Sequence, residues 1–445
     1  MKILNITAQK PHSTGSGTYL TELVNAFDRA GCKQAVVCGI YIDDNVEFPS
    51  GVSCYPVFFT DNIISFDRNY SSPAEASDEL FASCKRDVNI PSADSNALPF
   101  AITGMSDIMP YHSTRYRDLT PYMIAQFEDA FISTIKRAVE DLEPDLIICH
   151  HLFLLTSLVR KHFPRHKIIG ISHGTDLRQM INCRDLGDMV KPYIDKLDLI
   201  YALHDEQRKQ ILDIFDIDEG RVEVIGSGYN ATLFNTEGRK KRLPGEPLRI
   251  TYAGKISRPK GVPELLKAMS TVCRKYMDRT GDIGEIMLPF ELTLAGGCQD
   301  ESLKPFLDNL PPYVNWLGQI PQPALAELLR QTDIFVLPSY FEGLPLVLIE
   351  AMASGAIPIS TDLPGVKDWI DSNIDNPNVI YIPMPQMQSI DEPSDSGRSA
   401  FTSNLTEALS AIIDLLEFKR IDIPVPDTSR ITWDSLAKRL IEYKI

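Results

Sequence analysis

The chain has 445 residues, 44% of them hydrophobic and 23% charged, and a formal net charge of −16. The length predicts two domains of roughly 200 residues each, and the composition is typical of a globular protein. The negative charge argues against a nucleic-acid-binding protein, because phosphate contacts require a basic surface. It does not exclude a nucleotide ligand, which needs only a few local cations and backbone N–H groups.

The cysteines and the N-terminus indicate a cellular location. The eight cysteines include no C-x-x-C pair and no metal-ligand spacing, so we expect reduced, mostly buried thiols. The first residues, KILNIT, are an apolar strand without the basic and apolar regions of a signal peptide. No apolar stretch reaches the length of a membrane span. These features predict a soluble, cytoplasmic protein.

Short apolar runs alternate with longer amphipathic ones, which is the pattern of β-α-β units on a parallel sheet. In the first half, the expected strands are 2–7, 34–39, 146–149, 167–171, 199–202 and 222–225. In the second half, they are 249–253, 291–295, 334–337, 357–360 and 379–382. We therefore expect an α/β protein in which both halves share one architecture.

Polar segments suggest where the halves meet. The stretch 235–247, NTEGRKKRLPGEP, has the turn residues and charges of a linker. It would separate an N-terminal domain, 1–234, from a C-terminal domain, 248–426. Two further polar segments, 61–120 and 383–403, are predicted to be insertions, and the sequence does not decide whether they are ordered.

The segment 334–355, IFVLPSYFEGLPLVLIEAMASG, carries the strongest chemical signal. An apolar strand is followed by a loop with Glu342, Gly343 and Pro345, and then by a helix containing Glu350. The two carboxylates are expected to face different parts of one elongated ligand, because one lies in the loop and the other in the helix. Carboxylates accept hydrogen bonds from vicinal hydroxyls, so a sugar and a ribose would suit them. On spacing alone, a helix-dipole Glu and an ordinary helix Glu explain the pattern equally well.

The segment and its flanks resemble the E-x7-E signature of the retaining, family 4-type glycosyltransferases of group 1. Other stretches of the C-terminal half are similar to this family: YAGKISRPKG (252–261), VNWLGQIP (314–321), TDLPGVKDWI (361–370) and ITWDSLAKRLIEY (431–443). The resemblance implies the GT-B fold, in which two Rossmann-like domains face each other across a cleft. It also implies that the C-terminal helix, within 427–445, crosses back to the N-terminal domain.

The resemblance implies the residues of a nucleotide-sugar donor site. They are Gly15, Gly17, Lys255, Lys260, Gln319, Ile320, Glu342, Gly343, Leu344, Pro345, Leu346 and Glu350. By this resemblance Glu342 contacts the donor sugar, Glu350 the ribose, and Lys255 and Lys260 the diphosphate. Lys255 replaces the family's usual arginine and lacks its planar fork. Arg258 either compensates for this difference or is simply solvated.

Three further signals lie in the N-terminal half. Gly15 and Gly17 precede an expected helix, and such a loop lets backbone amides approach a diphosphate. His173 ends an expected strand, and the resemblance implies that it contacts the donor sugar, with Lys260 and Glu342 completing the catalytic set. The string HGTD resembles that of the glucosaminyl-malate synthases, which implies an acceptor role for Asp176. His150 either lines the acceptor site or packs in the core.

The resemblance therefore predicts an enzyme that transfers a sugar from a nucleotide diphosphate, UDP on family frequency, to an acceptor hydroxyl with retention. A β-phosphate oxygen would take the acceptor proton, and neither a cofactor nor a metal would be needed. The single D-x-D, 216–218, is expected to be a turn rather than a metal ligand. The alternatives are a nucleotide-sugar epimerase of the same fold and a non-catalytic sugar-nucleotide-binding protein.

The sequence is less informative about other partners. The basic cluster 160–167, RKHFPRHK, is the one candidate for peripheral membrane contact, and a solvated helix end is the favoured interpretation. The donor sugar, the acceptor and the oligomeric state are not predicted.

Overall fold

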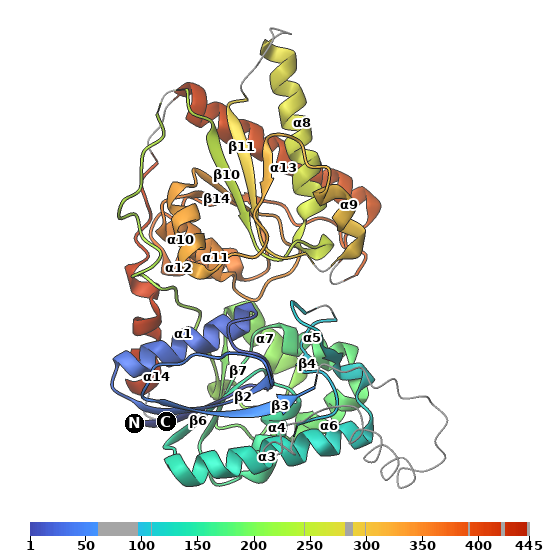
Figure 1. The fold of residues 1–445 in the computed structure, drawn as a ribbon, viewed down its shortest axis with the longest axis vertical. Coiled ribbons are helices and arrows are strands. Elements are labelled where there is room, and N and C mark those ends of the chain that lie inside the picture. Colours follow the sequence, from blue (N-terminus) through green and yellow to red (C-terminus); the bar gives the residue numbers. More distant parts are fainter. Residues whose placement is uncertain are drawn as a thin grey trace. The chain divides into compact units, whose positions relative to one another are not determined.

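The computed structural model describes residues 1–60, 97–107, 109–243, 245–280, 288–298, 300–389, 392–419 and 423–442 (Figure 1). These residues form two compact units. Unit 1 comprises the described parts of Met1–Ala202 and Arg208–Val224, and unit 2 comprises Leu203–Gln207 and the described parts of Ile225–Glu442. The short segment Leu203–Gln207 therefore packs with unit 2 although it directly follows a strand of unit 1.

Unit 1 is built on a seven-stranded parallel sheet with the order β3-β2-β1-β6-β7-β8-β9. Its strands are β1 (Lys2–Ile6), β2 (Lys33–Tyr41), β3 (Val52–Phe59), β6 (Leu146–His150), β7 (Ile168–Ile171), β8 (Leu199–Ala202) and β9 (Val222–Val224). Its helices are α1 (Gly15–Arg29), α3 (Pro121–Leu142), α4 (Leu154–His162), α5 (Thr175–Asn182), α6 (Arg184–Ile194) and α7 (Asp205–Ile214), whose first residues belong to unit 2.

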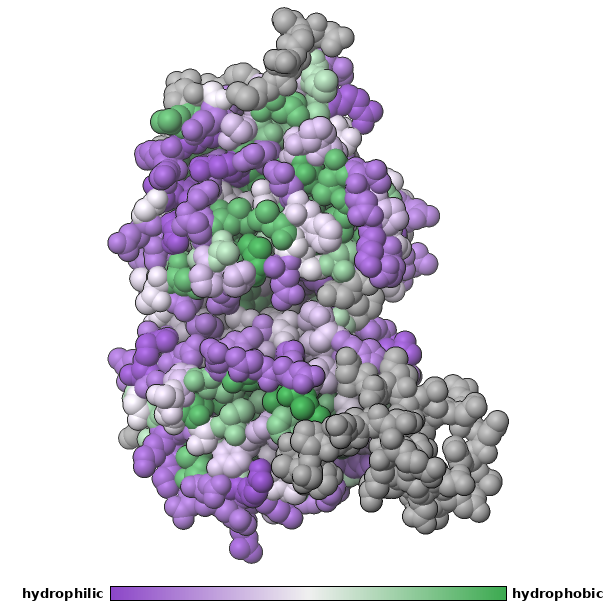
Figure 2. Space-filling model, viewed as in Figure 1, coloured by the Kyte–Doolittle hydropathy of each residue, from purple (hydrophilic) through white to green (hydrophobic). Residues whose placement is uncertain are grey.

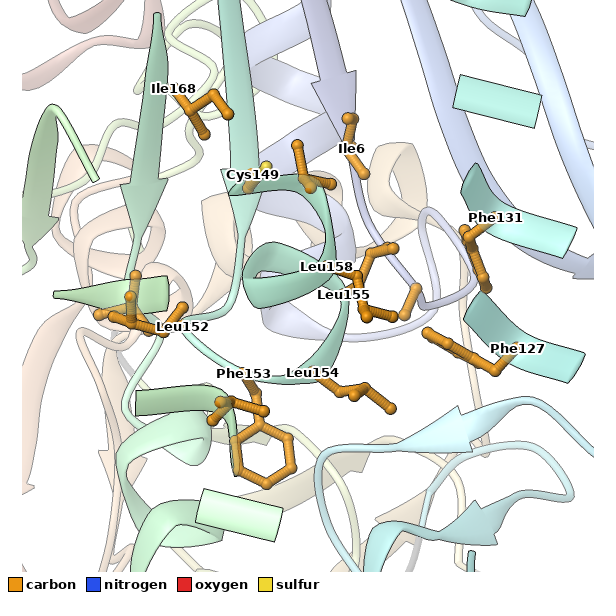
Figure 3. Packing of buried hydrophobic residues seen from close by; sticks show 14 of the residues in the cluster. Ile6, Phe127, Phe131, Cys149, Leu152, Phe153, Leu154, Leu155, Leu158 and Ile168 are labelled. Atoms are coloured by element: carbon orange, nitrogen blue, oxygen red, sulfur yellow. The ribbon is translucent and has the colours of Figure 1, made fainter. Parts of the chain in front are cut away.

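Helix α3 shows how the core of unit 1 is assembled. Thr120 caps the helix by accepting a hydrogen bond from the Met123 amide, and Pro121 occupies its first position. Phe127 and Phe131, one turn apart, are fully buried. Figure 3 shows both rings beside the leucines of α4. Burying each ring contributes about 2–3 kcal/mol of transfer free energy, which anchors α3 and α4 to the sheet.

Part of the predicted insertion 61–120 belongs to this core. Residues 61–96 lie outside the described residues, but Leu98, Phe100, Ile102 and Tyr116 are buried in the same cluster as the sheet. The short parallel strands β4 (Thr103–Gly104) and β5 (Thr114–Arg115) run through this segment. The described end of the insertion is therefore an integral part of unit 1.

Unit 2 has a six-stranded parallel sheet with the order β12-β11-β10-β13-β14-β15. Its strands are β10 (Leu248–Ala253), β11 (Phe290–Ala295), β12 (Val314–Trp316), β13 (Ile334–Leu337), β14 (Ile357–Thr361) and β15 (Ile380–Ile382). Its helices are α8 (Val262–Thr280), α9 (Lys304–Leu307), α10 (Gln322–Gln331), α11 (Leu346–Ala353), α12 (Val366–Asn373), α13 (Asp395–Asp414) and α14 (Trp433–Glu442).

The expected α/β architecture is confirmed. Every strand expected from the apolar pattern is present, with ends that shift by at most two residues. The pattern does not predict β3, an edge strand that contains Pro56 and exposes Cys54. An edge strand tolerates proline because one side of it makes no ladder hydrogen bonds.

In each sheet the strand order reverses once, between β1 and β6 in unit 1 and between β10 and β13 in unit 2. At such a topological switch point, the loops after the two central strands diverge to opposite faces of the sheet. Ligands of open α/β sheets bind in the crevice this leaves at the carboxyl ends of the strands. The two switch points are therefore the first places to look for a site.

Arg239 lies in the segment 235–247 that the sequence predicts to be a linker. Its guanidinium donates to the carbonyls of Arg330 and Ser354, at the carboxyl ends of α10 and α11. Cations stabilise these helix ends, where backbone carbonyls are unpaired. Arg239 is therefore a structural residue of unit 2. The exact domain limits and the packing of the C-terminal helix stay predictions.

The basic cluster 160–167 is largely neutralised by acidic partners. Arg160 pairs with Asp198 at 2.8 Å, and Lys161 and His162 both contact Glu128 at 2.6 Å. Hydrophilic residues cover much of the face drawn in Figure 2, with smaller hydrophobic patches between them. Among the described residues, no helix is long and apolar enough to cross a membrane. The buried Arg160 side chain differs from the solvated helix end favoured above, and peripheral membrane contact stays a prediction.

Candidate functional site

The switch point of unit 2 brings Lys260 and Glu342 together. Lys260 ends a short 3-10 helix, Arg258–Lys260, in the connection after β10, and Glu342 lies in the connection after β13. Because β10 and β13 are neighbours in a parallel sheet, both connections leave the same edge. The Tyr340 amide donates to the Pro259 carbonyl at 2.9 Å, which joins the two loops directly.

Glycines allow these loops to approach so closely. Gly261 has a φ of +65°, and a Cβ there would lie 2.0 Å from the Pro338 carbonyl oxygen. Gly296, after β11, has a φ of +150°, and a Cβ would lie 1.8 Å from the Gly254 carbonyl oxygen. No other residue fits either position without moving the backbone. The loops at this edge of the sheet are therefore a tightly packed, backbone-lined surface.

Lys260 and Glu342 form an ion pair of 2.7 Å between Nζ and Oε1. The Lys260 ammonium also faces the Phe341 carbonyl oxygen at 3.4 Å. The side chains are 25% and 17% exposed, so solvent and a ligand can reach both. Burial, with the nearby Glu342 carboxylate, raises the pKa of Tyr252. A neutral phenol, an ammonium and a carboxylate thus meet at this point.

The other predicted donor residues of unit 2 lie on the same edge of the sheet or in α11. Glu350 is in the second turn of α11 and is 6% exposed, and Pro345 occupies the cap position just before Leu346. The Lys255 carbonyl accepts a hydrogen bond from the Tyr252 hydroxyl at 2.7 Å. Gly343, Leu344, Gln319 and Ile320 follow β13 and β12. Glu342 and Glu350 occupy a loop and a helix, as the sequence predicts, and their contacts with a donor stay predictions.

The switch point of unit 1 holds a cluster of histidines. His150 ends β6, His151 follows it, and His173 lies just after the neighbouring strand β7. His150 Nδ1 and His173 Nε2 are 3.1 Å apart, and the two rings are stacked. The rings of His151 and His173 are 4.8 Å apart, and Tyr19 packs edge-on against His173 at 5.0 Å. The three imidazoles therefore form one contiguous group.

These histidines are neutral at neutral pH. Burial, reinforced by His151, lowers the pKa of His150 to about 3. Burial also lowers the pKa of His151, and that of His173 lies well below its ordinary value because of burial and its two histidine neighbours. Neutral imidazoles both donate and accept hydrogen bonds. The group thus offers polar contacts without charge.

A small pocket adjoins this cluster, and several of its polar atoms have no hydrogen-bond partner among the described residues. They are Gln9 Nε2, His150 Nε2 and both ring nitrogens of His151. His151 also has a φ of +73°, an uncommon conformation for a bulky residue. Buried polar atoms without partners cost free energy and are rare in native proteins. The space beside these atoms is smaller than a water molecule, so a ligand hydroxyl would reach them only after the surrounding side chains move.

Asp176, predicted to bind the acceptor, is fully engaged within the protein. One carboxylate oxygen accepts from the Leu152 amide at 2.7 Å, and the other accepts from the Ser172 hydroxyl and the His173 amide. The side chain is completely buried. Asp176 therefore holds the loops after β6 and β7 together, and its predicted acceptor role stays untested.

The predicted glycine loop differs from the structure in one respect. Gly15 and Gly17 do not precede a helix but are the first and third residues of α1. The helix starts this early because the Thr14 hydroxyl caps it, accepting from the Gly17 amide at 3.1 Å. The Gly17 amide is thus already engaged, which weakens its predicted part in diphosphate binding.

Two polar residues at the strand ends were not predicted from the sequence. Gln9 lies after β1, beside the histidine cluster, and His204 lies after β8 but packs with unit 2. Both are polar residues directly after an apolar strand, and this position is the signal that could have identified them.

The predicted D-x-D has the structure of a turn. The Asp218 carboxylate caps a 3-10 helix, Glu219–Arg221, by accepting from the Gly220 amide. Within the described ranges, no group of three or more His, Cys, Asp or Glu side chains could hold a metal ion.

The comparisons with known proteins agree with this geometry. Residues 234–392 match the family described as "Glycosyl transferases group 1". A D-inositol 3-phosphate glycosyltransferase of Corynebacterium kroppenstedtii is 29% identical over 187 residues, which are 40% of this chain and 41% of the relative. The chain thus matches about two fifths of the length of this relative.

Solved structures extend the similarity to the whole chain. Sucrose-phosphate synthase from Thermosynechococcus elongatus has a TM-score of 0.59 at 15% identity, covering 99% of this chain and 97% of that one. Anabaena HepE in complex with UDP-glucose has a TM-score of 0.54 at 14% identity, covering 99% and 98%. At these identities the likeness shows the fold. This chain therefore has the GT-B fold, and its residues 234–392 form a domain of the group 1 glycosyl transferase family.

Proposed function

We propose that the protein is a retaining glycosyltransferase that transfers a sugar from a nucleotide diphosphate, UDP in the first instance, to an acceptor hydroxyl. The observation that carries this proposal is the meeting of Lys260 and Glu342 at the switch point of the group 1 domain. The Lys260 cation would bind the diphosphate of a nucleotide sugar, and the adjacent Glu342 carboxylate would accept hydrogen bonds from the hydroxyls of the sugar. The UDP-glucose bound to a protein of the same fold supports the choice of donor.

In this proposal, Lys260 and Lys255 neutralise the charge that grows on the leaving diphosphate. Glu342 accepts hydrogen bonds from the donor sugar, and Glu350 from the ribose hydroxyls. The bond between the anomeric carbon and the β-phosphate oxygen breaks while the acceptor oxygen bonds to the same face of that carbon. The acceptor proton passes to the departing phosphate oxygen, so no side chain has to act as a general base.

The histidine cluster of unit 1 is proposed to bind the hydroxyl groups of the acceptor. The unpartnered atoms of Gln9, His150 and His151 are neutral hydrogen-bonding groups, which suits an uncharged, hydroxylated acceptor. His173 is proposed to contact the donor sugar. Asp176 positions His173 by accepting its backbone N–H, at 3.2 Å.

The proposal is tested with a panel of UDP- and GDP-sugars, each incubated with hydroxylated acceptors. Transfer is expected with at least one donor and is expected to persist in EDTA, since the residues above require no metal. Incubation with the donor alone distinguishes the epimerase reaction, which would make a new nucleotide sugar. The absence of any turnover across the panel would refute the proposed function.

Variants test the site itself. Lys260→Ala and Glu342→Ala are expected to lose transfer while folding normally. Lys304→Ala is a matched control, because Lys304 forms an exposed ion pair with Glu301 in the same unit, at 2.6 Å. Transfer at the wild-type rate by both site variants would overturn the site assignment.

A further inference from the structure

Tyr252 carries a buried phenol near the carboxyl end of β10, the strand that leads into the loop of Lys255 and Lys260. It is the second-last residue of the strand and is completely buried. A hydroxyl at this depth needs a hydrogen-bond partner. The Tyr252 hydroxyl donates to the Lys255 carbonyl at 2.7 Å. Because a carbonyl oxygen can only accept, the phenol is protonated in this contact.

The phenol stays protonated at neutral pH. Burial, together with the nearby Glu342 carboxylate, raises the pKa of Tyr252 well above its ordinary value. The bond to the Lys255 carbonyl is therefore one between two uncharged groups. Such a bond is electrostatically stronger in the protein interior than in water, because the local dielectric constant is lower.

Gly254 connects β10 to Lys255 and gives the loop its freedom. Its φ is +152°, a conformation that residues with a side chain rarely adopt, and a Cβ there would lie 3.0 Å from the Tyr252 hydroxyl oxygen. Glycine samples more backbone conformations than any other residue, so local sterics do not fix the peptide that follows it. Hydrogen bonds to neighbouring segments must fix the course of the loop instead.

Backbone hydrogen bonds hold the residues on both sides of Lys255. The Gly254 amide donates to the Ala295 carbonyl at 2.9 Å. The Ile256 amide donates to the Gly297 carbonyl, also at 2.9 Å. Both acceptors lie at or directly after the end of β11, which neighbours β10 (Figure 1). These bonds engage the amides that flank Lys255, whereas the phenol engages its carbonyl.

We infer that Tyr252 is a positioning residue for the diphosphate site: its phenol holds the Lys255 carbonyl and thereby fixes the backbone that carries the Lys255 ammonium. Lysine places its charge on a flexible four-carbon stem, without the rigid fork of arginine. The position of that charge therefore depends on a well-placed backbone. The effect on UDP binding rests on the proposed function, whereas the anchoring of the loop does not.

The substitution Tyr252→Phe removes the hydroxyl and keeps the buried ring, so the core of unit 2 retains its packing. We expect it to weaken UDP binding about 3- to 10-fold, as measured by isothermal titration. The matched control is Tyr313→Phe, which removes a phenol hydroxyl just before β12, at the opposite edge of the sheet. This control should bind UDP like the wild type. Unchanged UDP affinity in Tyr252→Phe would overturn the inference.

A double-mutant cycle with Lys255→Ala separates positioning from a general loss of stability. In the wild-type background, we expect Lys255→Ala to weaken UDP binding about 30-fold. In the Tyr252→Phe background, the same change should weaken it only about 3- to 10-fold, because the ammonium is already misplaced. An equal loss in both backgrounds would show that the phenol acts independently of Lys255 and would also overturn the inference.

Amide hydrogen exchange of residues 254–261 provides a readout that needs no ligand. Faster exchange of the Ile256 amide in Tyr252→Phe than in the wild type and Tyr313→Phe supports the anchoring of the loop, and equal exchange contradicts it. If UDP binds neither the wild type nor any variant, the proposed function fails, and exchange alone decides the role of Tyr252.

Discussion

The two switch points of this protein have the same topology but opposite electrostatics. In unit 2, the loops after β10 and β13 bring together an ammonium and a carboxylate that remain partly exposed. In unit 1, the loops after β1 and β6 surround three buried imidazoles, and burial lowers the pKa of each. One edge carries an accessible ion pair, and the other carries buried, uncharged imidazoles.

Under the proposed function, this difference lets one architecture serve two kinds of ligand. A diphosphate carries charge throughout a reaction, and a fixed cation stabilises it without reorganisation. A hydroxyl group carries no charge, and neutral partners bind it without the desolvation cost of an ion. The topology selects where a ligand binds, and the side chains at the strand ends select which ligand it is.

The largest expected effect comes from removing the cation of unit 2. Lys260→Ala should weaken UDP binding by about 100-fold, which corresponds to roughly 2.7 kcal/mol for a charge-assisted contact. Isothermal titration with UDP measures this loss, and Lys304→Ala serves as the control. Unchanged UDP affinity in Lys260→Ala would show that the cation of unit 2 does not bind the diphosphate.

Acid should affect unit 1 through its histidines. The pKa of His150 is about 3 in the folded protein and near 6.5 when the chain unfolds. Below pH 6.5, the unfolded chain binds a proton that the folded protein does not, so stability is complete above this pH and falls as the pH decreases. Each such histidine contributes at most about 1.4 kcal/mol per pH unit.

Denaturant unfolding at pH 7, 6 and 5 measures this dependence. His150→Gln should reduce the slope by up to one proton. A slope that is identical in wild type and His150→Gln would mean that His150 is not held neutral.

A Gln9 variant tests whether the histidine edge of unit 1 binds the acceptor. Gln9→Met removes an amide nitrogen that has no partner among the described residues while keeping the side-chain volume. The loss of one hydrogen bond to the acceptor should raise the acceptor KM about tenfold. The donor KM should not change, and the melting temperature should fall only slightly, because the variant loses one weak hydrogen bond, from the Ser16 hydroxyl to Gln9 Oε1 at 3.4 Å. A lower melting temperature with an unchanged acceptor KM would assign Gln9 a structural role.

The smallest expected effect concerns the competition within the ion pair. In the structure, the Glu342 carboxylate forms an ion pair with Lys260. In the proposed function, the diphosphate displaces this carboxylate. Glu342→Gln removes the competing charge and should tighten UDP binding about threefold, even though sugar transfer slows. Weaker UDP binding in Glu342→Gln would show that Glu342 organises the diphosphate site instead of competing with it.

The sequence predicts the strands well because buried parallel strands are short, continuous apolar runs. It also predicts that Glu342 and Glu350 lie on a loop and a helix, since Pro345 precedes the apolar run of α11. It predicts β3 poorly because an edge strand has no continuous apolar pattern. The early start of α1 is missed because the glycines there suggest a loop, whereas the Thr14 cap stabilises a helix.

Contacts between segments that are distant in the chain could not be predicted from the sequence. The ion pair of Lys260 and Glu342 depends on the order of the strands, which no local pattern specifies. The position of His204 depends on the segment Leu203–Gln207 packing with the unit to which the strand before it does not belong. Because the segment 61–120 is polar overall, the sequence does not predict that its last residues belong to the core. They pack there through a few apolar side chains such as Ile102 and Tyr116.

We propose above all that a nucleoside diphosphate binds at the charged edge of unit 2, beside Lys260 and Glu342. A crystal structure of the protein with UDP tests it most directly. We predict a β-phosphate oxygen about 2.7–2.9 Å from Lys260 Nζ, with the Glu342 carboxylate displaced from its position in the present ion pair. UDP bound elsewhere, or bound while the pair of Lys260 and Glu342 stays intact, would contradict it.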